Sequence, residues 1–313
     1  MTTVSEQAAY HQPVLAEQVR KALLVRPDGV YLDGTIGGGG HAEQLLPYLS
    51  PEALYIGIDR DTEALEFARK RLSAYPNVRF FHGTFAEMDA ALRTFSEQSL
   101  DGVLLDLGIS SHQVDEEARG FTFRPGAKLD MRMSPEDTLT AAEILNTYSY
   151  DALLRIFREY GEERRAGCIA RRVVQRREDK IFATSDDLVS VINRCVARKH
   201  AKKSYARIFQ ALRIEVNGEL LQLKIGLEKV LSLLRSGGRL VVISYHSLED
   251  RIVKNFLRTQ ENPCECPPEW PVCRCGKQPT MKRVRPYLIV PDEKEIQQNP
   301  RARSAKMRVG EKL

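Results

Sequence analysis

The chain has 313 residues, 42% of them hydrophobic, which is long for one domain and comfortable for two. It contains no run of about eighteen apolar residues and no basic-then-apolar leader, so the sequence argues against a membrane-spanning or secreted protein. Its six cysteines, without a signal peptide, fit a reducing cytosol better than a disulfide framework, and we expect a cytoplasmic protein.

The net charge of +5 is unevenly distributed along the chain. Residues 155–213 hold 16 Lys and Arg against 7 Asp and Glu, and residues 277–313 hold 10 against 4, which leaves −10 on the remainder. Two basic blocks on an acidic body favour a polyanionic partner that meets one face of the protein. The alternative is that both blocks are ordinary solvated helix faces.

The first third of the sequence alternates between strands and helices. After a polar lead and a helix that ends near residue 24, strands are predicted at 30–33, 54–59, 78–82 and 100–106, and helical patterns follow the first three of them. Each strand closes on a polar residue. The alternation predicts an α/β protein with a parallel, doubly wound sheet that binds its ligands at the carboxyl ends of the strands.

The strongest signal is the stretch VYLDGTIGGGGH at 30–41, in which a strand ends at Asp33 and five glycines follow within seven positions. Glycine permits φ > 0 and lets backbone N–H groups approach a ligand closely. A second strand ends at Asp59, about twenty residues on, where nucleotide-binding folds place a ribose-binding carboxylate. Together these features predict a nucleotide-type cofactor, although a tight turn would explain the glycines alone.

The alternation stops between residue 108 and about residue 213, where we expect helices and no strand. These helices are predicted at 140–148, 150–160, 162–177, 185–198 and 204–218. Alternation resumes with a helix to residue 234 and a strand at 239–244. We therefore expect a helical domain, residues 111–213, inserted into a core formed by 1–110 and 214–313. In the tail, 287–290 and 305–309 are predicted as a hairpin at the sheet edge.

Eight motifs along the chain carry a family resemblance: DGTIGGGGH (33–41), DLGISSHQVD (106–115), RGFTF (119–123), LDMRM (129–133), YGEE (160–163), FQALRIEVNGEL (209–220), ISYHSLEDRIVKNF (243–256) and NPRARSAKMRV (299–309). Together they resemble the bacterial 16S ribosomal RNA cytosine-N4 methyltransferase family over nearly the whole chain. The resemblance implies a Rossmann-like class I methyltransferase fold with an inserted helical domain. It also implies S-adenosylmethionine as cofactor and, as substrate, a cytidine N4 amine in the decoding region of the small ribosomal subunit.

The resemblance further implies which residues surround the cofactor. The turn residues would line its methionine and ribose portion, Asp59 would take the ribose hydroxyls, and Phe85 would lie against the adenine. His41 at the helix start and Phe85 have structural alternatives, a cap and a core position. The full set expected at the cofactor is Gly39, Gly40, His41, Asp59, Phe85, Asp106 and Gln113.

Two residues are candidates for the chemical step. Cytosine donates its amine lone pair into the ring, so an acceptor for the amine N–H groups is needed to make the nitrogen a nucleophile. Amino-methylating enzymes often carry acid-Pro-Pro-aromatic after the fourth strand. Here Asp106 keeps the acid without the prolines, and it is either this acceptor or a carboxylate of the cofactor shell. His246, in the Tyr-His-Ser segment after the next strand, is either a substrate contact or proton relay, or structural.

Two further groups of residues have open assignments. Asp130 with Arg132, and Arg213 with Glu215 and Asn217, would hold RNA or buttress the insert. Four thiols could bind tetrahedral zinc, but the one-residue spacing within each pair is tighter than the usual two to four. The sequence therefore assigns no metal site and leaves open the role of Cys264, Cys266, Cys273 and Cys275.

Two other functions compete with the methyltransferase. A dinucleotide oxidoreductase would share the first strand, turn and helix but has no use for the helical insert and the basic blocks. An RNA-binding assembly factor with a vestigial pocket would not need acids at three strand ends. We therefore expect a cytoplasmic enzyme that acts on 16S ribosomal RNA or the small subunit. The oligomeric state, a homodimer included, and the choice between naked RNA and a partly assembled subunit are left open.

Overall fold

The computed structural model describes residues 13–109, 116, 119–267, 269, 272 and 274–313. The chain divides into two compact units. The sheet unit is formed by Tyr10–Gly108 and Leu220–Leu313, and the helical unit contains Ile109–Glu219. Among the residues described, no helix is both long enough and apolar enough to span a membrane.

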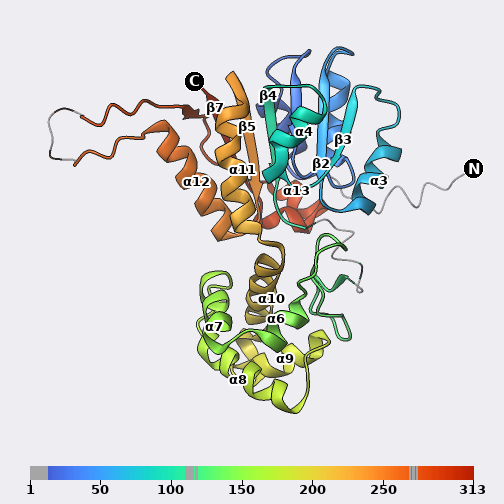
Figure 1. Ribbon diagram of the computed structural model, residues 1–313, viewed down its shortest axis with the longest axis vertical. Coiled ribbons are helices and arrows are strands. Elements are labelled where there is room, and N and C mark those ends of the chain that lie inside the picture. The colour runs from blue at the N-terminus through green and yellow to red at the C-terminus, as the bar shows by residue number, and fades with distance from the viewer. Residues whose placement is uncertain (1–12, 110–115, 117–118, 268, 270–271, 273) are drawn as a thin grey trace, which may run out of the picture. The chain divides into compact units, whose positions relative to one another are not determined.

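A seven-stranded sheet forms the centre of the sheet unit, in the order β3-β2-β1-β4-β5-β7-β6 (Figure 1). Strands β1 to β5 pair in parallel, whereas β7 is antiparallel to both of its neighbours. The expected Rossmann-like, class I methyltransferase sheet is therefore confirmed. The strands are β1 (Val30–Asp33), β2 (Leu54–Asp59), β3 (Val78–His82), β4 (Leu100–Asp106), β5 (Leu234–Ser244), β6 (Met281–Arg283) and β7 (Lys306–Lys312).

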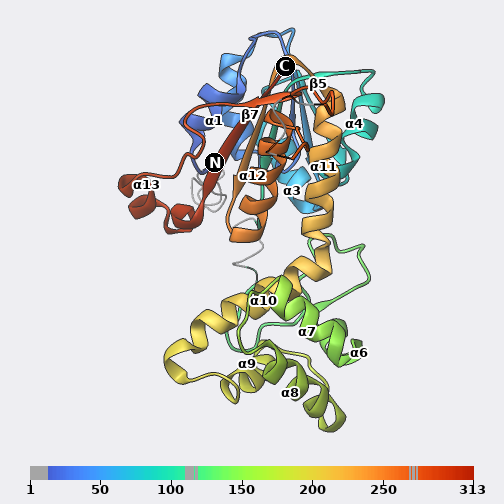
Figure 2. The ribbon, with the colours of Figure 1, turned by 90° about the vertical axis from the view of Figure 1, so that its left-hand side faces the viewer.

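Helices cover both faces of the sheet, as a buried parallel sheet requires. Successive strand residues point to opposite faces, so Tyr31 packs in one apolar cluster and Leu32 in the other. Figure 2 shows α1 on one side of the sheet and α4 and α11 on the other. The helices of this unit are α1 (Ala16–Leu23), α2 (Gly40–Leu45), α3 (Thr62–Arg71), α4 (Met88–Thr94), α11 (Glu219–Leu233), α12 (Ser247–Glu261) and α13 (Glu293–Gln298).

The helical unit packs around its own apolar core, in which Phe157, Ile169 and Leu188 are fully buried. Its helices are α6 (Ala141–Thr147), α7 (Tyr150–Glu159), α8 (Ala166–Asp179), α9 (Ser185–Asn193) and α10 (Ala201–Asn217). The only strand-like pairing among its described residues is an isolated bridge between Lys128 and Thr184. The prediction of an inserted all-helical region is thus confirmed, and α10 carries the helical unit past residue 213.

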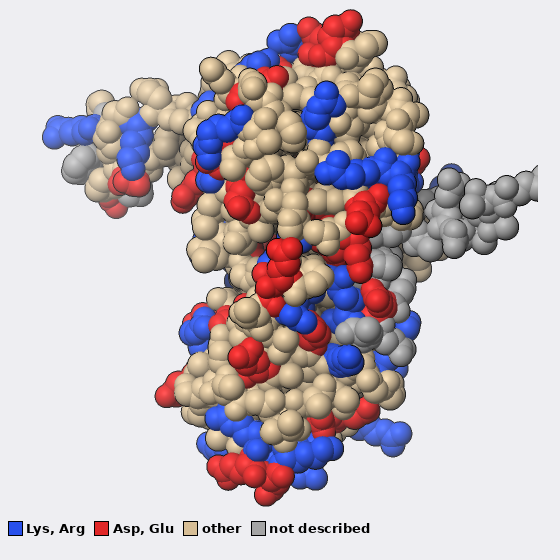
Figure 3. Space-filling view, turned by 45° about the vertical axis from the view of Figure 1, so that its right-hand side comes forward, with Lys and Arg blue, Asp and Glu red and all other residues tan. Residues whose placement is uncertain are grey.

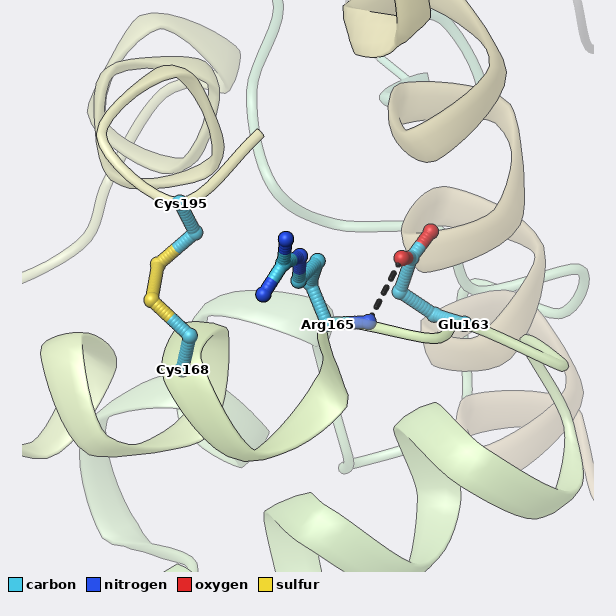
Figure 4. Close-up of a disulfide and its surroundings, with 4 residues drawn as sticks. All are labelled: Glu163, Arg165, Cys168 and Cys195. Carbon is cyan, nitrogen blue, oxygen red and sulfur yellow. Dashed lines mark hydrogen bonds between the residues drawn. A yellow bond between two sulfur atoms is a disulfide. The ribbon is translucent and has the colours of Figure 1, made fainter. Parts of the chain in front are cut away.

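A disulfide joins Cys168 of α8 to Cys195, which lies just beyond α9 (Figure 4). The two Cα atoms are 5.9 Å apart, and the sequence separation is 27 residues. The expectation that the cysteines stay as thiols is therefore wrong for this pair. Composition could not reveal the pairing, because it depends on the packing of α8 against α9.

The C-terminal tail differs from the predicted edge hairpin. Strand β7 lies inside the sheet between β5 and β6 rather than at its edge. The predicted partner segment, 287–290, contributes only an isolated bridge between Ile289 and Met307. The actual partner, β6, has the sequence Met-Lys-Arg, which offers no alternation long enough to indicate a strand.

Candidate active site

The glycine turn after β1 is tightly packed at Gly34 and less crowded, among the described residues, at Gly37. Gly37 and Gly39 have φ values of 49° and 78°, the left-handed region that favours glycine. A Cβ added at Gly34 would come within 2.6 Å of Leu105 and Phe85 side-chain atoms, whereas one at Gly37 would meet only the Thr35 carbonyl oxygen, at 3.9 Å. The turn leads directly into α2, whose first residue is Gly40.

Asp59 reaches this turn from the end of the neighbouring strand β2. Its Oδ2 accepts a hydrogen bond from the Gly37 N–H at 2.8 Å, and its Oδ1 accepts one from the Asp61 N–H at 3.0 Å. Burial raises the pKa of Asp59 to about 6, although the backbone hydrogen bonds from Asp61, Gly37 and Arg60 act in the opposite direction. A carboxylate has about four acceptor sites, so some acceptor capacity remains beside these three backbone hydrogen bonds.

Asp106, at the end of β4, lies between His41 and Tyr245. Tyr245 donates its hydroxyl proton to Asp106 Oδ1 at 2.9 Å. Asp106 Oδ2 is 3.4 Å from His41 Nε2, which is close enough for an ion pair when the ring is protonated. Burial lowers the pKa of His41, but the carboxylates of Asp106 and Asp33 raise it by more, so the net shift is upward. Burial and Asp106 together raise the pKa of Tyr245 well above its ordinary value, which keeps this phenol a donor.

A third carboxylate, Asp33, lies under the turn at the end of β1. It is almost fully buried, accepts hydrogen bonds from the Thr35 N–H and the Tyr55 hydroxyl, and has a pKa raised to about 6 by that burial. Thr35 also accepts the Asp106 N–H through its hydroxyl oxygen at 2.7 Å. Three neighbouring strands therefore end in acids that are linked through the glycine turn.

His246 caps the N-terminus of α12. Its Nδ1 accepts from the Glu249 N–H at 3.4 Å, and the Glu249 carboxylate accepts from the backbone N–H groups of Tyr245 and His246. Its Nε2 lies 3.1 Å from Glu249 Oε1, so both ring nitrogens face the first turn of the same helix. These contacts give His246 a helix-capping role.

Phe85 lies in a short 3₁₀ helix after β3, and its ring is half-buried in the core beneath the turn. A Cβ on Gly226 of α11 would come within 2.7 Å of Phe85 Cδ2, so the ring packs closely on that glycine. Gln113, the remaining residue expected at the cofactor, lies outside the residues that the structure describes.

The basic residues of α8 and those around the start of α10 differ in whether they contact the rest of the helical unit. Arg176 pairs with Asp187 and lies over the Phe182 ring, and Arg177 donates to the carbonyl oxygens of Leu145 and Tyr148. These two guanidinium groups brace the helical unit itself. Basic side chains that are exposed or half-buried, and for which no such bracing contact is seen in the described residues, are Arg171, Arg172, Lys199, Lys202 and Lys203. In Figure 3, Lys and Arg side chains stand beside acidic ones rather than forming an unbroken patch.

The two polar sets of uncertain role make their contacts inside the helical unit. Arg132 forms a two-pronged ion pair with Asp130, with both N···O distances at 2.8 Å, and also donates to nearby carbonyl oxygens. Arg213 pairs in the same way with Glu219. Asn217 accepts from the Met133 N–H and donates to the Met131 carbonyl oxygen. These two bonds hold the loop at residues 131–133 against the end of α10. Glu215 accepts from Tyr148 and Arg155.

The sequence profile of the MraW methylase family matches residues 8–313 of this chain. The chain belongs to the MraW methylase family. The family member named Ribosomal RNA small subunit methyltransferase H from Caldicellulosiruptor bescii is 46% identical over 304 residues, which cover 97% of this chain and 99% of that relative. The proteins of the same name from Carboxydothermus hydrogenoformans and Heliobacterium mobile are each 46% identical, over 307 and 309 residues, with 97% of this chain and 98% and 99% of those relatives covered. The family resemblance seen in the sequence is thus confirmed.

Three residues of this MraW methylase site were missed in the sequence. Thr35 lies in the glycine motif, but nothing local indicated that it holds the fourth strand. Tyr245 was named only as part of a segment, and its bond to Asp106 joins residues 139 positions apart. Glu295 of α13 bonds the Leu15 N–H across 280 positions, and its charge helps to raise the pKa of His41. Such long-range pairs leave no periodic signal in a single sequence.

Proposed function

We propose that this MraW methylase is an S-adenosylmethionine-dependent enzyme that methylates the N4 amine of a cytidine in the decoding region of 16S ribosomal RNA. The observation that supports this most directly is the row of acids at the ends of β1, β2 and β4, which are gathered around the glycine turn. The names of its relatives, which share nearly their full length with it, support a small-subunit RNA substrate.

The residues around the turn fit an adenosine-type cofactor. Asp59 would accept from the two ribose hydroxyls, and Phe85 would border the adenine. The turn and the loop after β4 would complete the site through Gly39, Gly40, His41, Asp106 and Gln113. When bound, S-adenosylmethionine supplies a sulfonium methyl group that is already electrophilic, so the protein contributes mainly position.

Asp106 is the proposed acceptor for the cytidine amine. A carboxylate has about four lone-pair sites, and Tyr245 uses one of them while His41 lies near another, so acceptor capacity remains. Accepting from the amine draws the nitrogen lone pair out of the ring and stabilises the positive charge that develops on nitrogen. Tyr245 and His41 fix the carboxylate in one orientation, which gives both of them a positioning role.

His246 is proposed as a second catalytic group, in substrate contact or proton relay. His246 directly follows Tyr245, the residue whose hydroxyl bonds Asp106, and this supports a place near the reacting groups. Its contacts with Glu249 support the capping role instead. The two roles are separated by replacing His246 with Asn, which retains a cap acceptor but has no titratable ring. Normal methylation by His246→Asn would remove His246 from the chemistry.

The insert at 111–213 is proposed to face the RNA, and the core at 1–110 and 214–313 to bind the cofactor. The phosphate contacts are assigned to the exposed group Arg171, Arg172, Lys199, Lys202 and Lys203, because Arg176 and Arg177 already brace the unit. The target base must leave its stack to reach the methyl group, at a cost of a few kcal/mol. A homodimer is compatible with this proposal, and sedimentation of the purified chain tests it.

The proposed function is tested by incubating the purified chain with labelled S-adenosylmethionine and either naked 16S ribosomal RNA or small subunits from cells that lack the protein. Mapping the nucleosides by mass spectrometry should locate N4-methylcytidine at one decoding-region position. The Asp59→Ala variant is the matched control and should transfer much less label. Label on another base, or on no RNA substrate, would overturn the assignment.

A further inference from the structure

The segment between α12 and β6 spans residues 262–280. It runs out from the end of α12 and returns to the sheet unit at β6 (Figure 1). None of its described residues is buried. These described residues therefore contribute little apolar burial, and another constraint would be needed to hold them in one conformation.

Three thiols converge within this segment. The Sγ atoms of Cys264, Cys266 and Cys275 all lie within 4.8 Å of one another. Cys264 and Cys266 are on the outgoing part of the segment and Cys275 is on the returning part. The contact therefore joins the two arms of the excursion, and the 2.6 Å ion pair between Glu265 and Lys277 joins them at the same level.

The surroundings of the sulfurs also suit thiolates. The backbone N–H of Arg274 donates to Cys266 Sγ at 3.3 Å. Such N–H···S bonds offset the negative charge of metal-bound sulfur and orient it. The Lys277 ammonium adds a positive charge beside the cluster, because its ion-pair partner Glu265 lies between Cys264 and Cys266 in the chain.

We propose that Cys264, Cys266 and Cys275 bind a zinc ion that fastens the two arms of this segment together. Zinc prefers tetrahedral thiolate ligands at about 2.3 Å, which places neighbouring sulfurs about 3.8 Å apart. The observed spacing reaches that value through small rotations of the side chains. The one-residue spacing between Cys264 and Cys266 counted against zinc in the sequence. Here the third thiol, Cys275, comes from the opposite arm, so the ion does not depend on closely spaced pairs alone.

Binding releases the three thiol protons and forms three zinc–sulfur bonds, with no change of oxidation state. A tetrahedral ion takes a fourth ligand that the described residues of this cluster do not supply, and Cys273 lies outside them. The ion would be structural, and the methyl-transfer chemistry does not depend on it. The competing occupant of the same geometry is a disulfide between two of the three cysteines.

The test is metal analysis of the full-length protein, purified under reductant from zinc-supplemented cells. We expect about one zinc per chain, bound by thiolates as in other structural sites. Replacing zinc with Co²⁺ should produce the visible d–d bands of tetrahedral cobalt and near-ultraviolet thiolate charge transfer. Cys264→Ser, Cys266→Ser and Cys275→Ser should each weaken zinc binding at least about tenfold, the lower range for loss of a supporting group.

The control is the double variant Cys168→Ser/Cys195→Ser, which removes two sulfurs from the helical unit and should keep its zinc. If a serine variant fails to fold, the metal can be removed from the parent protein with a chelator. Titration with Co²⁺ then measures binding at the site through the d–d bands. Substoichiometric zinc without the cobalt spectrum would overturn the proposal. So would zinc binding that the three variants leave unchanged, or a disulfide within the cluster under the same reductant.

Discussion

The sharpest prediction concerns the Asp106 carboxylate. In Asp106→Asn the amide oxygen can still accept from the Tyr245 hydroxyl, now 2.9 Å from Oδ1, and the amide nitrogen takes the place of Oδ2 beside His41. Shape and hydrogen bonding to Tyr245 are retained while the negative charge is lost. If that charge stabilises the nitrogen in the transition state, the single-turnover rate should fall about ten- to a thousand-fold, or about 1.4–4 kcal/mol.

The assay is single-turnover methylation at saturating S-adenosylmethionine, with the cofactor dissociation constant measured on the same preparation. Tyr245→Phe is the matched control, because it removes one hydrogen bond to the carboxylate but keeps its charge. Its rate should therefore fall by less than that of Asp106→Asn. A raised dissociation constant with a saturated rate within about threefold of the parent would refute a catalytic Asp106 and leave it in the cofactor shell.

Four further outcomes are expected. Asp59→Ala should weaken S-adenosylmethionine binding by about 1.5–3 kcal/mol in calorimetry. Because the pKa of Asp59 is raised to about 6 and hydroxyl donors prefer the ionised form, the parent's affinity should fall as the pH drops through 6, and Asp59→Asn should flatten that dependence. In the triple Ala variant of Arg171, Arg172 and Lys203, the plot of log RNA affinity against log salt concentration should become less steep, by roughly 0.7 for each phosphate contact removed. Its cofactor affinity should be unchanged. An unaltered slope would mean a merely solvated face. Reducing the disulfide, which spans 27 residues, should lower the unfolding free energy of the helical unit by about 3–4 kcal/mol in urea, whereas Cys168→Ser/Cys195→Ser should not respond to reductant.

Local sequence patterns were sufficient for much of the fold. Strands β1, β2 and β4 are nearly continuous buried runs, and the helices of the insert carry apolar residues at helical spacing, so both could be predicted from short windows. The position of β7 inside the sheet could not be predicted in this way, because strand order depends on contacts between distant segments. The Cys168–Cys195 disulfide is of the same kind, since it reports how two helices pack.

In the candidate site, too, some features could be predicted from the sequence and others depend on the folded packing. Asp59 and the glycine turn are adjacent in space because parallel strands bring their carboxyl ends together, and that rule can be applied to a sequence. Residue type alone could not tell that Arg171 is exposed whereas Arg177 braces the helical unit, because two arginines on the same helix can point in different directions. Arg177 turns to two backbone carbonyls of the helical unit, and only the folded packing reveals it.

The interior position of β7 has a consequence for how this chain folds during synthesis. The strand comprises Lys306–Lys312 and pairs with β5 on one side and β6 on the other, so it is translated after both of its partners. Until it emerges, β5 has an unpaired edge and β6 has no sheet to join. The described residues of the helical unit come from the single segment Ile109–Glu219, so this unit can reach its native packing earlier, because its contacts are more local. A nascent chain that stops before β7 therefore exposes an apolar strand edge of the kind that promotes aggregation, and β7 closes this edge when it pairs.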